Sequence, residues 1–212
     1  MIVADVMTRN PLYVHPEMSV AEARSLMKKE KIGRVPVLDK HNSLVGIVTE
    51  WDLVNACPSG ATTLDMYEIH YLLSKLKVEE VMQRSVVSIP EDVVVEEAAR
   101  IMVDNDISAL PVMNGDTLVG IVSDGDLFKL FINLFGARET GARVTMVLPE
   151  RQGELHDITH AIAGIGGNIR SMVICDGPDV KSKKCIIKVA DVSVVDLEKA
   201  VRPFVIDITD VR

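Results

Sequence analysis

The chain has 212 residues, of which 48% are hydrophobic and 25% are charged, a balance typical of a folded protein rather than a disordered one. Its 31 acidic residues outnumber its 23 basic ones, and the formal net charge of −8 argues against general nucleic-acid binding, which requires a basic face. No apolar run approaches the ~20 residues of a membrane span, no signal peptide is visible, and three cysteines are too few for a disulfide framework. We therefore expect a protein of the reducing cytoplasm, with neither a nucleic-acid nor a membrane partner.

The sequence repeats itself. Val3–Met7 returns in similar form as Val78–Met82, 75 residues later, and Leu44–Val48 returns unchanged as Leu118–Val122. This offset exceeds the roughly 20–50 residues of solenoid repeats, so it predicts two copies of a small folding unit. The predicted boundaries are residues 1–56 for the first copy, 57–77 for a linker helix, 78–136 for the second copy and 143–212 for a different C-terminal domain.

Each copy predicts the same series of elements: a short strand, an amphipathic helix, two strands joined by a polar turn, and a second helix. Apolar residues at spacings of three and four indicate the first helix, and a run that is apolar throughout indicates a buried strand. The predicted strands and helices are Pro11–Val14, Val20–Met27, Val35–Leu38 and Leu44–Val48 in the first copy, and Val86–Ile89, Val95–Met102 and Leu118–Val122 in the second.

Two further helices carry apolar faces that we expect to meet a partner. The linker helix follows the chain break at Pro58–Gly60 and has apolar residues at helical spacing. The helix that starts at Asp124 has a wide apolar face from Leu127 to Phe135. Both faces are candidate surfaces for a homodimer.

Beyond Gly136 the pattern changes to strand, helix, strand, strand, helix, strand, the split ferredoxin-like arrangement. The fold class is therefore α/β (α+β), with a duplicated module and a βαββαβ domain. The predicted elements are strands at Arg143–Leu148, Ile169–Cys175, Cys185–Val189 and Phe204–Val211, and helices at Leu155–Ile165 and Val194–Val201.

The duplicated unit resembles the CBS-domain pair, also called the Bateman module. Four segments carry the resemblance: Val6-Met7-Thr8, Arg34–Val37, Gly46–Asp52 and Gly120–Asp126. It implies a non-enzymatic regulatory protein that binds an adenosine-containing ligand (AMP, S-adenosylmethionine or ATP) and uses no catalytic cofactor and no metal.

The tail resembles an ACT domain through Gly153-Glu154-Leu155 and Gly167-Asn168-Ile169. Paired CBS domains followed by an ACT domain are similar to acetoin-utilisation proteins of the AcuB type. In an ACT domain a small ligand, often an amino acid, binds where two domains meet. The matching positions are Gln152, Gly153, Asn168 and Ile169. Many ACT domains only dimerise, and that alternative stays open.

Two motifs, Thr49-x-x-Asp52 and Ser123-x-x-Asp126, each follow a buried strand and open a helix. The hydroxyl then lies where a helix N-terminus offers free N–H groups to a phosphate, and the carboxylate can accept hydrogen bonds from a ribose diol, as in the CBS family. The alternative is a capping box that needs no ligand. The resemblance places the nucleotide clefts at Thr8, Lys31, Arg34, Val35, Pro36, Thr49, Asp52, Ala109, Leu110, Pro111, Ser123 and Asp126.

Charge distinguishes the two predicted clefts. Lys31 and Arg34 precede the Pro-Val pair of the first copy, whereas Asp106 and Ala109 hold these places in the second. Coulomb attraction therefore favours an AMP-like anion in the first cleft and an empty cleft, or an uncharged or cationic adenosyl group, in the second. Neither motif has a basic residue between its hydroxyl and its carboxylate, which argues against ATP.

Two alternatives to a ligand sensor remain. One is a structural dimerisation module with vestigial clefts. The other is a metal hydrolase that uses His156 and His160, which share a helix face at a spacing of four. Catalytic zinc needs a third ligand, which the sequence does not identify. The prediction is a sensor that acts on a regulated protein the sequence does not name.

Overall fold

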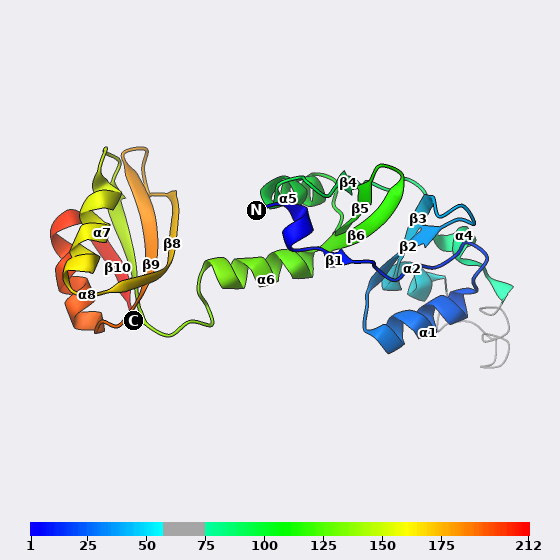
Figure 1. Ribbon diagram of the computed structural model, residues 1–212, viewed down its shortest axis with the longest axis horizontal. Coiled ribbons are helices and arrows are strands. Elements are labelled where there is room, and N and C mark those ends of the chain that lie inside the picture. Colours follow the sequence, from blue (N-terminus) through cyan, green and yellow to red (C-terminus); the bar gives the residue numbers. More distant parts are fainter. Residues whose placement is uncertain (57–74) are drawn as a thin grey trace. The chain divides into compact units, whose positions relative to one another are not determined.

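The computed structural model describes residues 1–56 and 75–212, and the chain divides into two compact units, Met1–Leu127 and Phe128–Arg212 (Figure 1). Most of the predicted linker helix at 57–77 lies outside the described residues. Within the described ranges, no helix is both long and apolar enough to cross a membrane.

The first copy folds as a helix and a β-hairpin. Its long helix begins with a capping box, in which the Ser19 hydroxyl accepts from the Glu22 N–H at 3.2 Å and the Glu22 carboxylate accepts from the Ser19 N–H at 3.0 Å. It ends where Lys31 adopts a left-handed conformation. The elements are α1 (Val20–Glu30), β2 (Arg34–Leu38), β3 (Leu44–Thr49) and the short α2 (Glu50–Asn55).

The second copy repeats this plan and adds pairing strands on both sides of its hairpin. The sheet order is β1-β6-β5-β4, with β4 parallel to β5 and the other neighbours antiparallel. The elements are α4 (Val78–Val81), β4 (Ile89–Pro90), α5 (Val95–Asp104), β5 (Ala109–Asn114), β6 (Thr117–Ser123) and α6 (Asp124–Leu134), while η1 (Val3–Asp5) and β1 (Thr8–Arg9) come from the N-terminus of the chain.

The two copies exchange their leading segments. β1 pairs with β6 of the second copy, and Val3 and Met7 are buried in the core of that copy. In return, Val78 and Met82 are buried in the core of the first copy. The predicted copies at 1–56 and 78–136 follow the sequence repeat, and the hydrophobic core of each copy is completed by the leading residues of the other.

Two glycines allow this exchange. A Cβ placed on Gly46 would lie within 3.0 Å of the Met82 side chain, and one placed on Gly120 would come equally close to Met7. Both glycines lie in the Gly-Ile-Val run of a hairpin, over which the methionine of the other copy passes. The repeated glycine is thus explained by close approach rather than by backbone conformation.

The strands predicted at Pro11–Val14 and Val86–Ile89 are largely absent. Only Val14 pairs in the first segment, through hydrogen bonds with Pro36 and Leu38 at 3.0 Å each. The second segment forms a strand only at its end, in β4. Within the described residues, the segments before Val14 and Ile89 have no neighbouring strand to pair with. They therefore form no β-ladder.

The second unit has a four-stranded antiparallel sheet in the order β10-β7-β9-β8, with the predicted βαββαβ element order. The last strand starts later than predicted because residues from Arg202 to Phe204 form a 3₁₀ turn. The elements are β7 (Ala142–Pro149), α7 (Glu154–Gly164), β8 (Asn168–Asp176), β9 (Ser182–Ala190), α8 (Val194–Val201), η2 (Arg202–Phe204) and β10 (Asp207–Val211).

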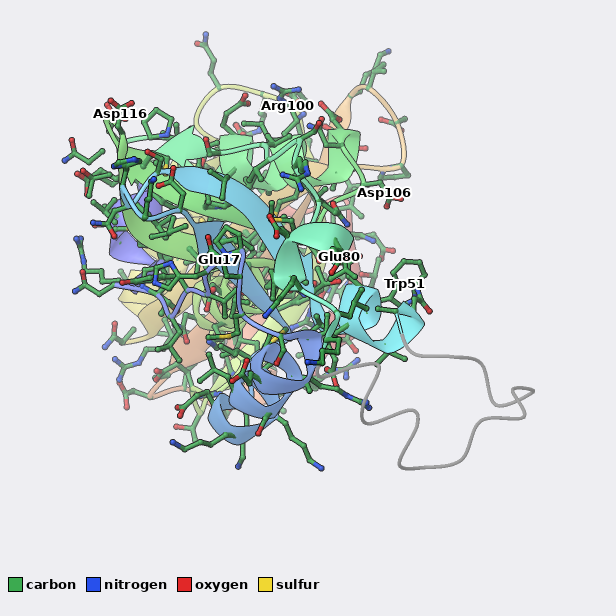
Figure 2. The ribbon with its side chains drawn as sticks, turned by 90° about the vertical axis from the view of Figure 1, so that its right-hand side faces the viewer. Glu17, Trp51, Glu80, Arg100, Asp106 and Asp116 are labelled. Atoms are coloured by element: carbon green, nitrogen blue, oxygen red, sulfur yellow. The ribbon has the colours of Figure 1, made fainter. Side chains whose placement is uncertain are left out.

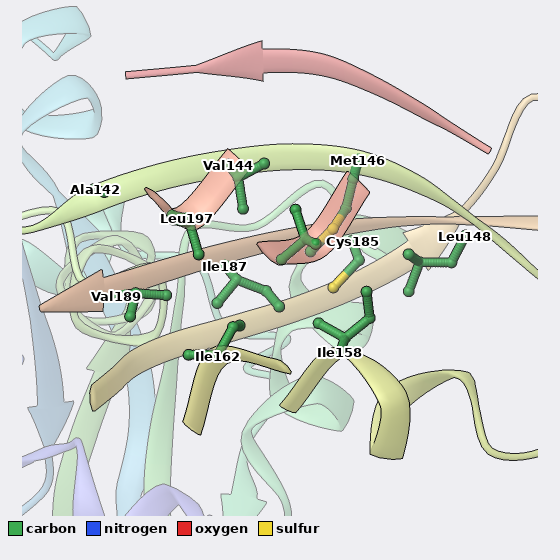
Figure 3. Close-up of a cluster of buried hydrophobic side chains, with 11 residues drawn as sticks. Ala142, Val144, Met146, Leu148, Ile158, Ile162, Cys185, Ile187, Val189 and Leu197 are labelled. Carbon is green, nitrogen blue, oxygen red and sulfur yellow. The ribbon is translucent and has the colours of Figure 1, made fainter. Parts of the chain in front are cut away.

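One face of this sheet packs against α7 and α8 (Figure 3). Alternate residues of β7 supply Val144 and Met146, which meet Ile158 of α7 and Leu197 of α8. Cys185 lies in the same core, and burial raises the pKa of its thiol to about 12. It therefore behaves as a small apolar core residue.

Candidate functional site

A pocket of about 470 Å³ lies in the first unit and draws its walls from both copies. The first copy contributes the hairpin and the start of α2, and the second contributes the loop before β5 and the segment before β4. Figure 2 shows Trp51 and Asp106, one from each copy, on the same side of the unit. The lining residues are Arg34, Ile47, Thr49, Trp51, Gln83, Ser85, Val86, Val87, Asp106, Ile107, Ser108, Ala109 and Pro111.

Strand alternation decides which predicted residues reach this pocket. Arg34 and Thr49 are directly opposite each other in the β2–β3 hairpin and line the pocket, whereas Val35 between them is fully buried in the core. In β5, Ala109 and Pro111 line the pocket while Leu110 is fully buried. The side chains of Val35 and Leu110 are therefore core residues, whereas the predicted contact of the adenine was with the backbone at these positions.

Both hydroxyl–carboxylate motifs form capping interactions. Asp52 Oδ2 accepts from the Thr49 N–H at 2.8 Å and from the Thr49 hydroxyl at 2.7 Å, and the Asp52 N–H donates to Thr49 Oγ1 at 3.2 Å. Asp126 Oδ2 accepts from the N–H and hydroxyl of Ser123 at 3.1 and 2.7 Å. The capping box is thus complete in the first copy, and in the second copy the Asp126 carboxylate makes the same two bonds to Ser123.

These caps alter the expected phosphate seat. The carboxylate of Asp52 accepts from the N–H and hydroxyl of Thr49 at the start of α2, and α2 has only six residues. A short helix with a carboxylate at its N-terminus gives little further attraction to a phosphate. The bonds to Thr49 use Oδ2 of Asp52, so a ribose hydroxyl would have to use Oδ1.

Arg34 is held by the second copy. Its Nη1 donates to the Ser108 carbonyl and lies 3.2 Å from Oδ1 of Asp124. The side chains of Arg34 and Asp124 are 24% and 50% exposed, so water reaches the carboxylate more than the guanidinium. The sequence predicted Arg34 and Asp106 in different clefts, whereas in the structure the two residues line the same pocket. Arg34 therefore does not give one cleft a positive charge that the cleft of Asp106 lacks, as the predicted contrast required.

The other predicted cleft residues lie outside the lining. Thr8 is exposed and pairs with Ile121 in the β1–β6 ladder, and Lys31 is exposed after α1. Pro36, Asp52, Leu110, Ser123 and Asp126 are also outside it. A cleft that gathers Lys31 with Arg34 is thus not formed around this pocket.

Sequence reasoning missed the part of the wall formed by Gln83 and by residues 85–87. Gln83 bridges to Ile47 of the first copy, so the exchanged segment brings this stretch to the pocket. The repeat contained a signal for this part of the wall, because both copies exchange their leading segments in the same way. The alternation of core and surface residues along each strand does not show which segments reach the pocket.

A second pocket, of about 500 Å³, lies in the second unit and is lined by residues from Glu150 to Leu155. It includes Gln152 and Gly153, which we expected to hold a small ligand. Asn168 and Ile169 pair near Ala190, at the end of the sheet opposite to Pro149. The 11 residues of α7 span about 16 Å between these ends, so one chain does not bring the four residues together.

His156 and His160 are exposed on α7, with their rings stacked at 5.8 Å. Throughout the described ranges, no group of three or more His, Cys, Asp or Glu residues is arranged to hold a metal ion.

Comparisons with known proteins identify the first unit. The family model of the CBS domain matches residues 3–59 and 78–133. An L-aspartate semialdehyde sulfurtransferase from Methanocaldococcus jannaschii is 32% identical over 131 residues, which make up 61% of this chain and 23% of that protein. The chain therefore spans about a quarter of the length of this relative.

Solved structures agree. The CBS domain pair of protein MJ0100, in complex with 5′-methylthioadenosine and S-adenosyl-L-methionine, is 31% identical with a TM-score of 0.53, over 66% of this chain and 98% of that one. A Vibrio cholerae protein described as an acetoin utilization protein (AcuB) is 32% identical, with a TM-score of 0.54 over 66% and 96% of the two chains. CBSX2 in complex with AMP is 30% identical, with a TM-score of 0.50 over 62% and 96%. The chain belongs to the CBS domain family, of which it carries two copies.

Proposed function

We propose that the chain is a regulatory protein that binds an adenosine-containing ligand in the pocket between its two CBS copies. The observation that carries the proposal is that this pocket draws its walls from both copies and includes Thr49 of the first hydroxyl–carboxylate motif. A ligand there would contact two hairpins at once, so its binding would favour one arrangement of the copies over another. The complexes of MJ0100 and CBSX2 with adenosine compounds support this ligand class.

The test is calorimetry with 5′-methylthioadenosine, S-adenosylmethionine and AMP on the wild type and on two variants. Val87→Trp fills the pocket from its rim, where Val87 is 36% exposed. Val103→Trp is the matched control, since Val103 is exposed on α5 and does not line the pocket. We expect binding to the wild type and the control and at least a tenfold loss in Val87→Trp. Equal binding to both variants would refute the proposed site.

The alternative of a dimerisation module with vestigial clefts also has a specific observation in its favour, because the carboxylates of Asp52 and Asp126 are both hydrogen-bonded within their own motifs without a ligand. It predicts that none of the three compounds binds to the wild type. Mass spectrometry of the denatured protein should then find no copurified nucleotide.

We further propose that residues 143–212 form an ACT domain that contributes to a homodimer. The βαββαβ order and the pocket at Gln152 and Gly153 support this domain, and the separation of Asn168 from that pocket would require a second chain to complete a four-residue site. Analytical ultracentrifugation with and without amino acids tests it. A monomer under all conditions would contradict it.

A further inference from the structure

The charges around the pocket between the copies are nearly balanced. Within the described residues that line it, Arg34 is the only cation and Asp106 the only anion. Asp106 is exposed at the loop before β5, where its left-handed φ of 53° follows the end of α5. A ligand that enters the pocket therefore meets one carboxylate and one guanidinium.

The guanidinium already has an anion. Its Nη1 is 3.2 Å from Oδ1 of Asp124 and also donates to the Ser108 carbonyl. The same Asp124 oxygen accepts from the Gly125 N–H at 2.7 Å, which fixes the carboxylate at the start of α6. Both partners of Arg34 belong to the second copy, so the pair also ties the β2–β3 hairpin to that copy.

Together the three side chains carry one positive and two negative charges. A 5′-phosphate brings close to two more negative charges at neutral pH. It would compete with Asp124 for the charge of Arg34 and would be repelled by Asp106. A thioether or a sulfonium group at the 5′ carbon carries no negative charge. It therefore neither competes with Asp124 for Arg34 nor is repelled by Asp106.

We propose that the pocket selects adenosyl ligands whose 5′ substituent is uncharged or positively charged, and that Asp124 enforces this selection by holding Arg34. This inference rests on the proposed function and specifies its ligand. Arg34 is the specificity-determining residue, because its charge attracts a phosphate only when Asp124 no longer neutralises it.

The experiment compares 5′-methylthioadenosine, S-adenosylmethionine and AMP by calorimetry on the full chain. We expect the wild type to bind AMP at least about tenfold more weakly than 5′-methylthioadenosine, which lacks the phosphate. In Asp124→Asn, AMP should bind about tenfold more tightly than in the wild type, whereas the affinity for 5′-methylthioadenosine should change by less than about twofold.

Two controls isolate the ion pair. Glu50→Gln removes one negative charge from the first position of α2, the repeat equivalent of Asp124, and should leave the affinity for AMP unchanged. In the double variant Arg34→Gln/Asp124→Asn the gain in AMP affinity should vanish, because the gain depends on the released guanidinium. If Asp124→Asn fails to fold by circular dichroism, Asp124→Ser replaces it, because serine keeps a side-chain hydrogen-bond acceptor at the start of α6 without the charge.

The outcomes separate the two proposals. If 5′-methylthioadenosine binds but AMP binds equally well, with no change in Asp124→Asn, the selection by Asp124 is refuted and the proposed function stands. If none of the three compounds binds to the wild type or to any variant, the proposed function fails and the selection with it.

Discussion

Lys31 and Asp106 occupy the same place in the two copies, and each follows the long helix of its copy in a left-handed conformation, with φ of 55° and 53°. The backbone requirement is therefore shared, while the charge is opposite. The same holds across the hairpins, where Arg34 and Trp51 of the first copy correspond to Ala109 and Gly125 of the second. The two copies therefore share backbone geometry and core packing, and they differ in the side chains around the pocket.

The largest expected effect tests the hydrophobic core packing that the two copies share. Leu110→Ala removes a fully buried side chain from the core of the second copy and should lower the free energy of unfolding by about 2–5 kcal/mol. Val35→Ala, its equivalent in the first copy, should also destabilise. Val87→Ala on the pocket rim is the control and should cost less than about 1 kcal/mol. Denaturant unfolding measures all three, and an equal loss at Val87 would contradict the division into core and pocket faces.

A second prediction tests the exchange of leading segments. Gly120→Ala forces a Cβ against Met7, and Gly46→Ala does the same against Met82. Each should lower the free energy of unfolding by about 1–3 kcal/mol through overpacking. Gly33→Ala, where a Cβ meets nothing within 4 Å, serves as the control.

In a double-mutant cycle with Met7→Ala, the cost of Gly120→Ala should shrink, because the smaller side chain leaves room for the added methyl group. Strict additivity of the two changes would show that Met7 does not pass over Gly120.

A third prediction separates capping from binding. Thr49→Ala removes a helix cap and Ser123→Ala removes the hydroxyl bond to Asp126, and each should cost about 1 kcal/mol of stability. Of these two residues, only Thr49 lines the pocket, so we expect Thr49→Ala alone to weaken binding of 5′-methylthioadenosine. Thermal unfolding and calorimetry measure the two effects, and equal losses of binding would place a second ligand at Ser123.

The smallest expected effect tests the charge of Asp106, which differs from that of its counterpart Lys31 in the first copy. Asp106→Asn removes the carboxylate from the pocket, and asparagine tolerates the left-handed conformation as aspartate does. Stability should stay within about 0.5 kcal/mol of the wild type, while AMP should bind about threefold more tightly because a repulsion is removed. An unchanged affinity for AMP would show that Asp106 does not face the ligand.

Much of this molecule could be predicted from its sequence. The repeat, the capping motifs and the apolar periodicity gave both copies and the βαββαβ order, because these features depend on local spacing. The exchange of Met7 and Met82 could not be predicted that way, since a repeat unit read along the sequence does not say which core its first residues enter. For the same reason the ion pair of Arg34 with Asp124 could not be predicted, since the two residues are 90 positions apart.

Trp51 offers the most direct test of the central claim, that the pocket between the copies binds an adenosyl ligand. It is the only tryptophan of the chain, lines the pocket and is 72% exposed, so its fluorescence reports on that pocket alone. Excitation at the red edge of the tryptophan band avoids absorption by adenine. Titration with 5′-methylthioadenosine should change the emission saturably, and Thr49→Ala but not Ser123→Ala should shift this change to higher ligand concentrations. An emission that stays constant, while calorimetry detects binding elsewhere or none, would contradict the account.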